Sequence, residues 1–468
     1  TETLAVRRSD PELRELARRA SLILILVSTV FGAISGVGIW VVAGLISPGA
    51  ISALIHTYVW GWAMEWVFFV LEIVAALVYY TTWDKISKGA HLLVGWLYVV
   101  GAYMSLVVIN GIITYMLTPG RWLETRAFWD GFFNPTYWPS LVLRTGICIL
   151  MAVAFMLWSA YRANPDRRPE LVRYLGWWFF GGALLSYAGY RWWEAVLPDT
   201  VKALFLGETP SLLTLADTRS FTLWSLAVAL AVCVLALLLA PRFARSVTAL
   251  ALMASAFGFF GGYERLREGI RKPFLIHSHL FSNGLLVGQI DEINRSGIAA
   301  HSGWVALGDP APEALGGRIF AAECASCHTL DGYQSIREAL PTVTDMELVV
   351  ADEPPGSGAV HYLEQCSACH SDVAYEDMVG MLPSVEEIRE DPEFIRELNL
   401  GMITMTVMEL KEMGAAVTDF DPHSTFDMQT LDRPTMPPFV GTDDEAEALA
   451  IYLASLDDGR SATSGGAR

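Results

Sequence analysis

Long apolar runs separated by short polar segments fill the first 263 residues. A transmembrane helix needs about 20 consecutive apolar residues. The runs therefore predict about seven spans, at about residues 21–46, 52–80, 89–117, 140–161, 172–197, 221–240 and 246–263. Residues 1–20 are charged instead. Leu13, Leu16 and Ala17 fall on one side of them, as in an amphipathic helix at a membrane surface.

The apolar runs become short after residue 263. A short amphipathic helix is expected at 315–320 and another at 443–456, the latter with Ala446, Leu449, Ala450 and Leu453 on one face. The chain is thus predicted to be all-α, a polytopic membrane helix bundle followed by a mostly α-helical domain outside the membrane. The expected segments are an N-terminal cytoplasmic segment 1–20, a bundle 21–263, an outer connector 264–312, a second domain 313–457 and a disordered tail 458–468.

Composition and charge divide the chain in the same way. Hydrophobic residues make up 53% and charged residues 18%, whereas soluble domains average about 45–50% and about 25%. Residues 1–310 carry 24 basic and 20 acidic side chains, a net charge of +4, and residues 311–468 carry 8 and 30, a net charge of −22. The total of −18 argues against nucleic acid as a partner. The apolar composition instead favours membrane lipids as the surroundings of residues 21–263.

The distribution of Lys and Arg predicts the orientation. With the N-terminus inside, the inner segments hold 13 of them and the three outer loops hold four. Seven spans then place the acidic part outside. The predicted location is the cytoplasmic (inner) membrane of a bacterium, crossed several times, with the C-terminal domain on the periplasmic, outer face.

Four of the six cysteines form two pairs, each followed by histidine: Cys324, Cys327 and His328, then Cys366, Cys369 and His370. Two thiols on one helical turn can add to the two vinyl groups of one haem, and the next histidine becomes the proximal iron ligand. Zinc would need four ligands at each site, which two separate CxxCH units supply poorly. We therefore predict two covalently bound c-type haems. Cys148 and Cys233 stand alone in apolar runs, where burial is expected.

Methionines are the candidate distal ligands. Met436 opens the sequence Met-Pro-Pro-Phe ahead of the last helix, and this ending resembles the distal-methionine loop and closing helix of class I cytochromes c. Met378 and Met381 follow the second CxxCH unit and are candidates for the other haem. Met402, Met405 and Met408 are spaced as core-packing residues of a helix instead.

Ionisable residues in the apolar part are further candidates. Glu65 and Glu72 lie two turns apart on one face of an expected span, where acids are costly and usually functional. Proton relay, haem contact or a hydrogen bond to another helix are the alternatives. On the expected outer side, His56, His277 and His279 are candidate haem ligands, with Arg271 and Lys272 as partners of haem propionates. His91 is expected on the inner side, in a proton-uptake or structural role.

The sequence from Trp66 to Glu72, continued by Trp83-Asp84, His91, Asn110-Gly111 and Pro119, resembles the larger, haem-carrying subunit of cytochrome bd quinol oxidases. Glu268-Gly269-Ile270-Arg271-Lys272-Pro273 is similar to the E-x-G-R-Q-P signature of that family. The resemblance covers about residues 25–275. It implies a respiratory membrane subunit that works with a second, homologous membrane subunit.

The resemblance also has departures. The first family helix has no counterpart, and the quinol-binding loop is cut to about 198–220. Arg144, Trp224 and Gly261 stand where the family has haem-ligating residues. A b- or d-type haem in the membrane part thus remains an open expectation.

The haem motifs and the family resemblance predict two alternative functions. The first is an oxidoreductase, the c-haem-bearing subunit of a bd-like oxidase, which passes electrons from an external donor through two c haems toward a membrane haem and oxygen. The alternative is a dihaem electron-transfer subunit on a degenerate bd-like membrane anchor. The acidic domain suits a basic soluble cytochrome as the donor.

Overall fold

The computed structural model of this chain describes residues 1–198, 201–202, 206, 215–301, 311–332, 335–340, 343–361, 374–418 and 437–456. The chain divides into two compact units. Unit 1 comprises Thr1–Leu45 and Ile51–His277, and unit 2 comprises Ile46–Ala50 and Ser278–Arg468. Both are built almost entirely of helices.

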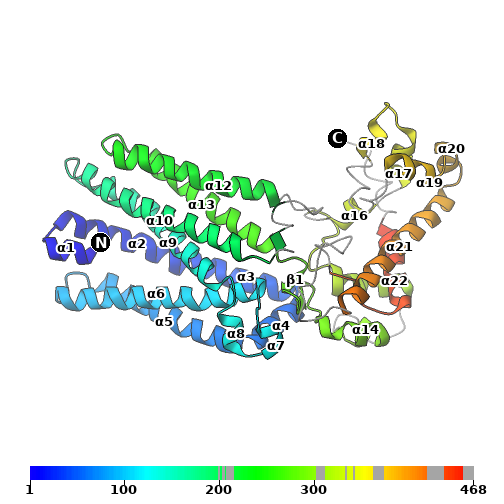
Figure 1. The fold of residues 1–468 in the computed structure, drawn as a ribbon, viewed down its shortest axis with the longest axis horizontal. Helices are drawn as coiled ribbons and strands as arrows, with labels where there is room; N and C mark the ends of the chain where they lie inside the picture. Colours follow the sequence, from blue (N-terminus) through cyan, green and yellow to red (C-terminus); the bar gives the residue numbers. More distant parts are fainter. Residues whose placement is uncertain are drawn as a thin grey trace. The chain divides into compact units, whose positions relative to one another are not determined.

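Unit 1 is a bundle of long helices that run side by side (Figure 1). Its elements are α1 (Glu2–Arg8), α2 (Pro11–Ile25), the π-helical segment η1 (Leu26–Gly32), α3 (Ala33–Ile46), α4 (Pro48–Thr57), α5 (Val59–Thr81), α6 (Lys88–Leu117), α7 (Trp122–Thr125), α8 (Phe128–Phe132), α9 (Tyr137–Ala160), α10 (Arg168–Val196), α12 (Leu215–Val232), the π-helical segment η2 (Cys233–Leu239), α13 (Ser246–Gly269) and the short strand β1 (Phe274–Ile276). The last residue of α3, Ile46, and the first three residues of α4, up to Ala50, belong to unit 2.

Local sequence signals explain where these helices begin. The side chain of Asp10 accepts a hydrogen bond from the Leu13 amide at the start of α2, and Pro11 occupies the first helical position. Ser87 caps α6 through the Ala90 amide in the same way. The amphipathic segment predicted at 1–20 is helical, with Leu13 and Leu16 buried. It forms two helices rather than one, because Ser9 ends α1 in the left-handed conformation and α2 continues past residue 20 into the first apolar span.

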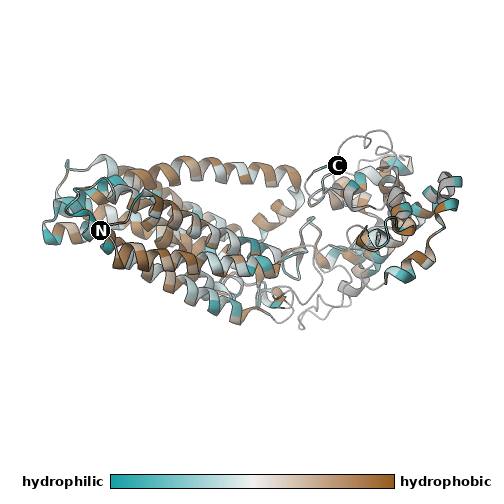
Figure 2. Ribbon diagram, turned by 90° about the horizontal axis from the view of Figure 1, so that it is seen from above, coloured by the Kyte–Doolittle hydropathy of each residue, from teal (hydrophilic) through white to brown (hydrophobic). Residues whose placement is uncertain are grey.

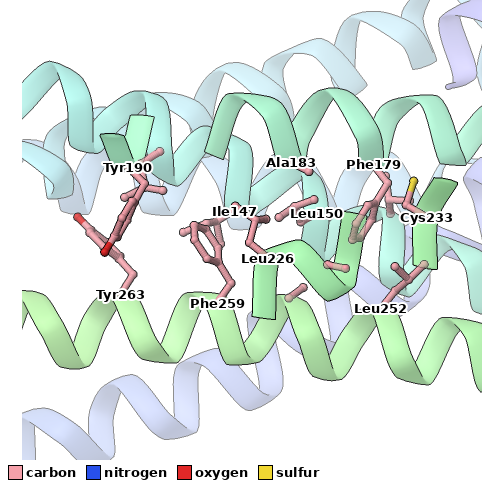
Figure 3. Close-up of a cluster of buried hydrophobic side chains, with 14 of the residues drawn as sticks. Ile147, Leu150, Phe179, Ala183, Tyr190, Leu226, Cys233, Leu252, Phe259 and Tyr263 are labelled. Carbon is pink, nitrogen blue, oxygen red and sulfur yellow. The ribbon is translucent and has the colours of Figure 1, made fainter. Parts of the chain in front are cut away.

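The buried core of unit 1 lies among α9, α10, α12, η2 and α13 (Figure 3). Tyr190 of α10 lies beside Phe259 and Tyr263 of α13. Phe179 of α10 lies further along the cluster, near Cys233 and Leu252, and aliphatic side chains lie between these two groups. Cys233 is fully buried here, as expected, whereas Cys148 is exposed on α9, so the expectation of burial was wrong for Cys148. In contrast, α3 has no buried residue, and its exposed face is apolar.

Among the described residues, six helices are long and apolar enough to cross a membrane: Pro11–Ile46, Val59–Thr81, Lys88–Leu117, Tyr137–Ala160, Leu215–Leu239 and Ser246–Gly269. The span expected at 172–197 is α10, a helix of 29 residues rich in Gly, Trp and Tyr, and it is not among the six because these residues lower its hydropathy. Figure 2 shows hydrophobic residues along most of the bundle and hydrophilic residues at the end where the N-terminus lies. The chain is an integral membrane protein.

Unit 2 consists of shorter helices. Its elements are β2 (Leu280–Phe281), the 3₁₀ segments η3 (Val287–Gln289) and η4 (Ile298–Ala300), α14 (Ile290–Ser296), α15 (Pro312–Ile319), the π-helical segment η5 (Phe320–Cys324), α16 (Ile336–Ala339), α17 (Val343–Ala351), α18 (Ser357–His361), α19 (Tyr375–Met381), α20 (Val385–Glu390), α21 (Pro392–Thr418) and α22 (Asp443–Ser455).

Helices α15 and α22, far apart in sequence, pack closely against each other in unit 2. A Cβ atom on Gly316 would lie 1.9 Å from the carbonyl oxygen of Ala448, so only glycine allows this approach. Beside the crossing, the rings of Phe320 and Tyr452 are 5.7 Å apart. The segment that follows α15 carries Cys324, so this crossing fixes where the first CxxCH unit begins.

Gly316→Val is therefore expected to destabilise unit 2 by about 3 kcal/mol or more, because the clash is with backbone and cannot be relieved by a side-chain rotation. Thermal unfolding of the detergent-solubilised protein measures this effect. Gly401→Ala on α21, where a Cβ atom meets nothing within 4 Å, is the control and should leave the transition in place. Equal transitions for both variants would contradict the crossing.

The short segment Ile46–Ala50 of unit 2 comes from a distant part of the sequence. Ala50 is 2% exposed. Gly284, at a φ of +95°, lies so close that a Cβ atom there would be 2.8 Å from the Ala50 nitrogen. Unit 2 therefore includes part of the connection between α3 and α4.

Candidate functional site

The two acids of α5 lie against α6. The Ser105 hydroxyl donates a hydrogen bond to Glu65 Oε1 at 3.2 Å. Glu72, two turns further along, packs its backbone against Gly101 of α6, where a Cβ atom would lie 3.0 Å from the Glu72 nitrogen. Both acids are half-buried. An acid that is hydrogen-bonded and partly shielded can hold or release a proton, so this geometry is compatible with proton relay and with a structural hydrogen bond.

A second cluster joins α1 to α5 and α6. His91 Nδ1 lies 2.9 Å from Glu2 Oε1, and His91 Nε2 lies 2.9 Å from the carbonyl oxygen of Tyr79. The Tyr79 hydroxyl donates to Glu2 Oε2 at 2.7 Å. Because a carbonyl oxygen only accepts, Nε2 carries a hydrogen. The Glu2–His91 contact then holds one shared proton, either as a carboxylic acid with neutral imidazole or as a carboxylate with imidazolium. Both ring nitrogens are occupied, which fits the expected proton or structural role of His91.

His91→Ala should lower the free energy of unfolding by about 2–3 kcal/mol, because it removes the hydrogen-bond partner of Glu2 Oε1 and of the Tyr79 carbonyl oxygen. The midpoint of thermal unfolding in detergent tests this. Lys88→Ala, at an exposed position in the first turn of the same helix, should change it little. A His91→Ala variant as stable as the Lys88→Ala variant would show that the cluster contributes nothing to stability.

A network of five charged side chains joins α9 to the end of α13. Arg144 Nη2 lies 2.7 Å from Glu264 Oε1, and Arg267 Nε lies 2.9 Å from Glu264 Oε2. Arg267 also approaches Glu268, at 3.6 Å, and Glu268 pairs with Arg271. We call these five residues the arginine network. It has three positive and two negative charges, and therefore one net positive charge.

Arg271 and Arg267 of the arginine network each have a buried guanidinium nitrogen without a hydrogen-bond partner among the described residues. Arg271 is 4% exposed and also donates to the Leu275 carbonyl oxygen, but its Nε has no hydrogen-bond partner among the described residues. Arg267 Nη1 is likewise buried and without one. Buried guanidinium donors without acceptors are unfavourable, and an anionic group such as a carboxylate would satisfy them. Lys272, half-buried, follows directly.

The three histidines predicted as haem ligands differ in their surroundings and burial. His56, at the end of α4, is exposed, and its Nδ1 is within hydrogen-bond distance of the Ser52 carbonyl oxygen at 2.7 Å. His277 is buried in unit 1, and this burial lowers the pKa of its imidazole to about 4, so the ring is neutral at pH 7. His279 belongs to unit 2 and is half-buried.

Two of the positions aligned with ligands of the bd family are open to the surroundings. Trp224 is 71% exposed on α12. Gly261 is exposed on α13, with nothing within 4 Å of a Cβ atom placed there. The third, Arg144, is engaged by Glu264. Arginine, tryptophan and glycine are not usual ligands of haem iron, so on this expected alignment these three positions supply none.

The first CxxCH unit forms one tight turn at the end of η5. The Cys327 and His328 amides both donate to the Cys324 carbonyl oxygen, at 3.0 and 2.9 Å. Cys324 and Cys327 are free thiols and both are half-buried. Two accessible thiols and an imidazole on one turn are the donor set that covalent attachment of a haem requires. These residues fit a c-type haem.

Only some of the other candidate haem-binding residues lie among the described residues. Cys366, Cys369, His370 and Met436 lie outside the described residues. Met378 of α19 packs into a small core with Val349 of α17, whereas Met381 is 65% exposed. A sulfur buried among apolar side chains is less available as a ligand than an exposed one, so of these two methionines Met381 is the more accessible candidate.

The expected core role of the α21 methionines was wrong for Met405, which is 61% exposed. The buried positions of this helix include Asn399, Ile403 and Val407 instead. Their four-residue spacing defines the covered face, and Met405 points away from it.

Sequence reasoning missed several charged residues that the structure brings into buried contacts, among them Glu2, Glu264 and Glu323. Glu264 and Arg267, three residues apart on an apolar helix, were a signal for an intrahelical ion pair. Glu2 and Glu323 gave no such signal, because their partners lie 89 and 117 residues away.

The comparisons with known proteins support the membrane part. No curated protein and no solved structure matches the chain. Residues 1–174 match the family model of the cytochrome bd terminal oxidase subunit I. This region includes α5, α6, Glu65, Glu72, His91 and Arg144, and the similarity to Glu268–Pro273 lies beyond it. In these 174 residues the chain is therefore similar to subunit I of the cytochrome bd oxidases, a similarity that indicates a respiratory electron-transfer role in the membrane.

Proposed function

We propose that this protein is the c-haem-bearing subunit of a bd-like respiratory complex. It takes electrons from an external donor into two covalently bound c haems and delivers them toward an oxygen-reducing site in the membrane. The observation that carries the proposal is the Cys324–His328 turn, built into a chain whose first 174 residues are similar to subunit I of cytochrome bd oxidases.

The close crossing of α15 and α22 supports the c-haem part. It brings the helix ahead of the first CxxCH unit against the last helix of unit 2, and Pro437–Phe439 precedes that last helix. A haem held there by Cys324, Cys327 and His328 supplies reversible one-electron transfer. The chain's residues attach the haem, supply its proximal ligand and shield it. Cys366, Cys369 and His370 would do the same for the second haem, with Met436 and Met381 or Met378 as distal candidates.

Three features of the membrane part support transfer onward. Glu65 and Glu72 offer proton-carrying groups inside the bundle. The unpartnered donors of Arg267 and Arg271 suit the propionates of a non-covalent haem, with Lys272 beside them. His56, His277 and His279 remain candidates for its iron ligand.

One observation favours a second candidate function. Arg144 is tied to Glu264, and Trp224 and Gly261 are exposed, so the usual ligand positions of the family are lost. In this alternative, unit 1 is a degenerate anchor without an oxygen-reducing site, and the protein is a dihaem electron-transfer subunit.

Partners are implied in both cases. The exposed apolar face of α3 suits lipid or a second, bd-like membrane subunit. The net charge of −22 on residues 311–468 suits a basic cytochrome as donor on the periplasmic side. In the proposed orientation the N-terminus is cytoplasmic.

The haem content of the purified complex tests the proposal. A pyridine haemochrome spectrum should contain the bands of c-type haem together with those of a b- or d-type haem. Bands of c-type haem alone would support the anchor alternative. A spectrum without c-type haem would refute both functions.

A further inference from the structure

Glu323, the residue directly before Cys324, is a buried acid that haem attachment does not use. It is 7% exposed. Its Oε2 accepts a hydrogen bond from the Val440 amide at 3.1 Å, and in the part of the chain that the structure describes its Oε1 has no hydrogen-bond partner. A carboxyl at this position would ordinarily be expected to face water, so its burial calls for a reason.

The hydrogen bond that Glu323 accepts comes from the loop that follows Met436. This loop, Pro437–Gly441, is held at three points. The Phe439 amide donates to the Leu410 carbonyl oxygen of α21 at 3.0 Å, the Val440 amide donates to Glu323, and the Gly441 amide donates to Asn294 Oδ1 at 3.0 Å. Val440 is 0% exposed, so without Glu323 its amide would be buried with no acceptor.

A second buried acid, Glu445, acts on the Glu323 carboxyl. Glu445 accepts three backbone hydrogen bonds, from the Ile298, Ala299 and Thr442 amides at 2.9, 3.1 and 2.9 Å, which suits a carboxylate. Burial raises the pKa of Glu323 well above its usual range, the Val440 hydrogen bond opposes this, and the charge of Glu445 adds to it. Glutamine matches Glu323 in shape and keeps an oxygen that can accept the Val440 hydrogen bond.

We propose that Glu323 is a positioning residue for the first c haem. Its bond to the Val440 amide ties the CxxCH turn to the loop after Met436 and so fixes the two walls of the haem site relative to each other. This inference rests on the proposed function, because it needs a haem at Cys324 and Cys327. It assigns to Glu323 a role in setting the reduction potential of that haem and in excluding external ligands.

The matched pair Glu323→Leu and Glu323→Gln tests the proposal. Leucine fills a similar volume without an acceptor, and glutamine keeps a carbonyl oxygen for Val440. Glu447→Ala, at an exposed position on α22, is the control. Intact mass measures covalent haem, potentiometric titration measures the two reduction potentials, and imidazole titration measures access to the ferric iron.

Glu323→Leu should keep both haems, lower the potential of one, and bind imidazole at least tenfold more tightly. Water that enters a loosened site stabilises the ferric charge. A tenfold change in the one-electron reduction equilibrium corresponds to 59 mV. Glu323→Gln and Glu447→Ala should match the wild type.

Unchanged potentials and imidazole affinity in Glu323→Leu would overturn the inference, as would a Glu323→Gln variant as perturbed as Glu323→Leu. If Glu323→Leu yields no haem-loaded protein, Glu323→Gln decides alone. Wild-type imidazole affinity then supports the proposal, and raised affinity overturns it. A wild type without covalent haem would refute the proposed function itself.

Discussion

Replacing Cys324 and Cys327 by alanine should remove the mass of one haem from the intact protein, and replacing Cys366 and Cys369 should remove the mass of the other. A CxxCH unit attaches its haem by two thioether bonds, so without both thiols the haem is held by its iron ligand alone and is lost on denaturation. Intact-mass spectrometry of the denatured chain measures the result.

The remaining cysteines provide the control. Cys233→Ala, in the core of unit 1, and Cys148→Ala, on its exposed surface, should leave both haem masses in place. A wild-type mass with a single haem would contradict the assignment of the second CxxCH unit, and unchanged masses in either double variant would contradict the assignment of the unit that it removes.

Glu72→Gln should lower oxygen consumption of the assembled complex by about 100-fold or more, if the acid pair of α5 relays protons. Glutamine preserves the size of the side chain and its packing beside Gly101, but it cannot give up a proton. The c haems should remain fully reducible by dithionite, because electron entry does not involve this residue.

Glu124→Gln, at an exposed position on α7, serves as the matched control and should retain full activity. Full activity in Glu72→Gln would indicate that the acid is structural and would favour the anchor alternative. Loss of assembled complex in Glu72→Gln but not in Glu124→Gln would point the same way.

Much of the fold could be predicted because it depends on one-dimensional patterns. Apolar runs of membrane length identified the six apolar spans, and an apolar stripe identified helical structure within residues 1–20, but not its break at Ser9. The span at α10 shows the limit of hydropathy. Tyr190 and Trp193 are fully buried in the core, yet aromatic residues of this kind score poorly on a hydropathy scale.

The candidate site could be predicted where chemistry is encoded by spacing. Cys324, Cys327 and His328 lie on one turn because they are adjacent in sequence. The Arg144–Glu264 and Glu323–Val440 contacts join residues 120 and 117 positions apart, and nothing local in the sequence marks either partner. Such contacts follow from how the helices pack, which periodicity does not specify.

The origin of Ile46–Ala50 affects how unit 2 can be isolated. The chain leaves unit 1 after Leu45, contributes these five residues to unit 2, returns at Ile51, and enters unit 2 again at Ser278. A soluble fragment that starts at Ser278 would lack a segment that packs beside Gly284 and would expose the surface that Ala50 covers. Proteolytic cleavage after His277 would likewise leave that segment attached to the membrane fragment, so recovery of an intact unit 2 calls for a short peptide supplied in trans or a fusion that restores the segment.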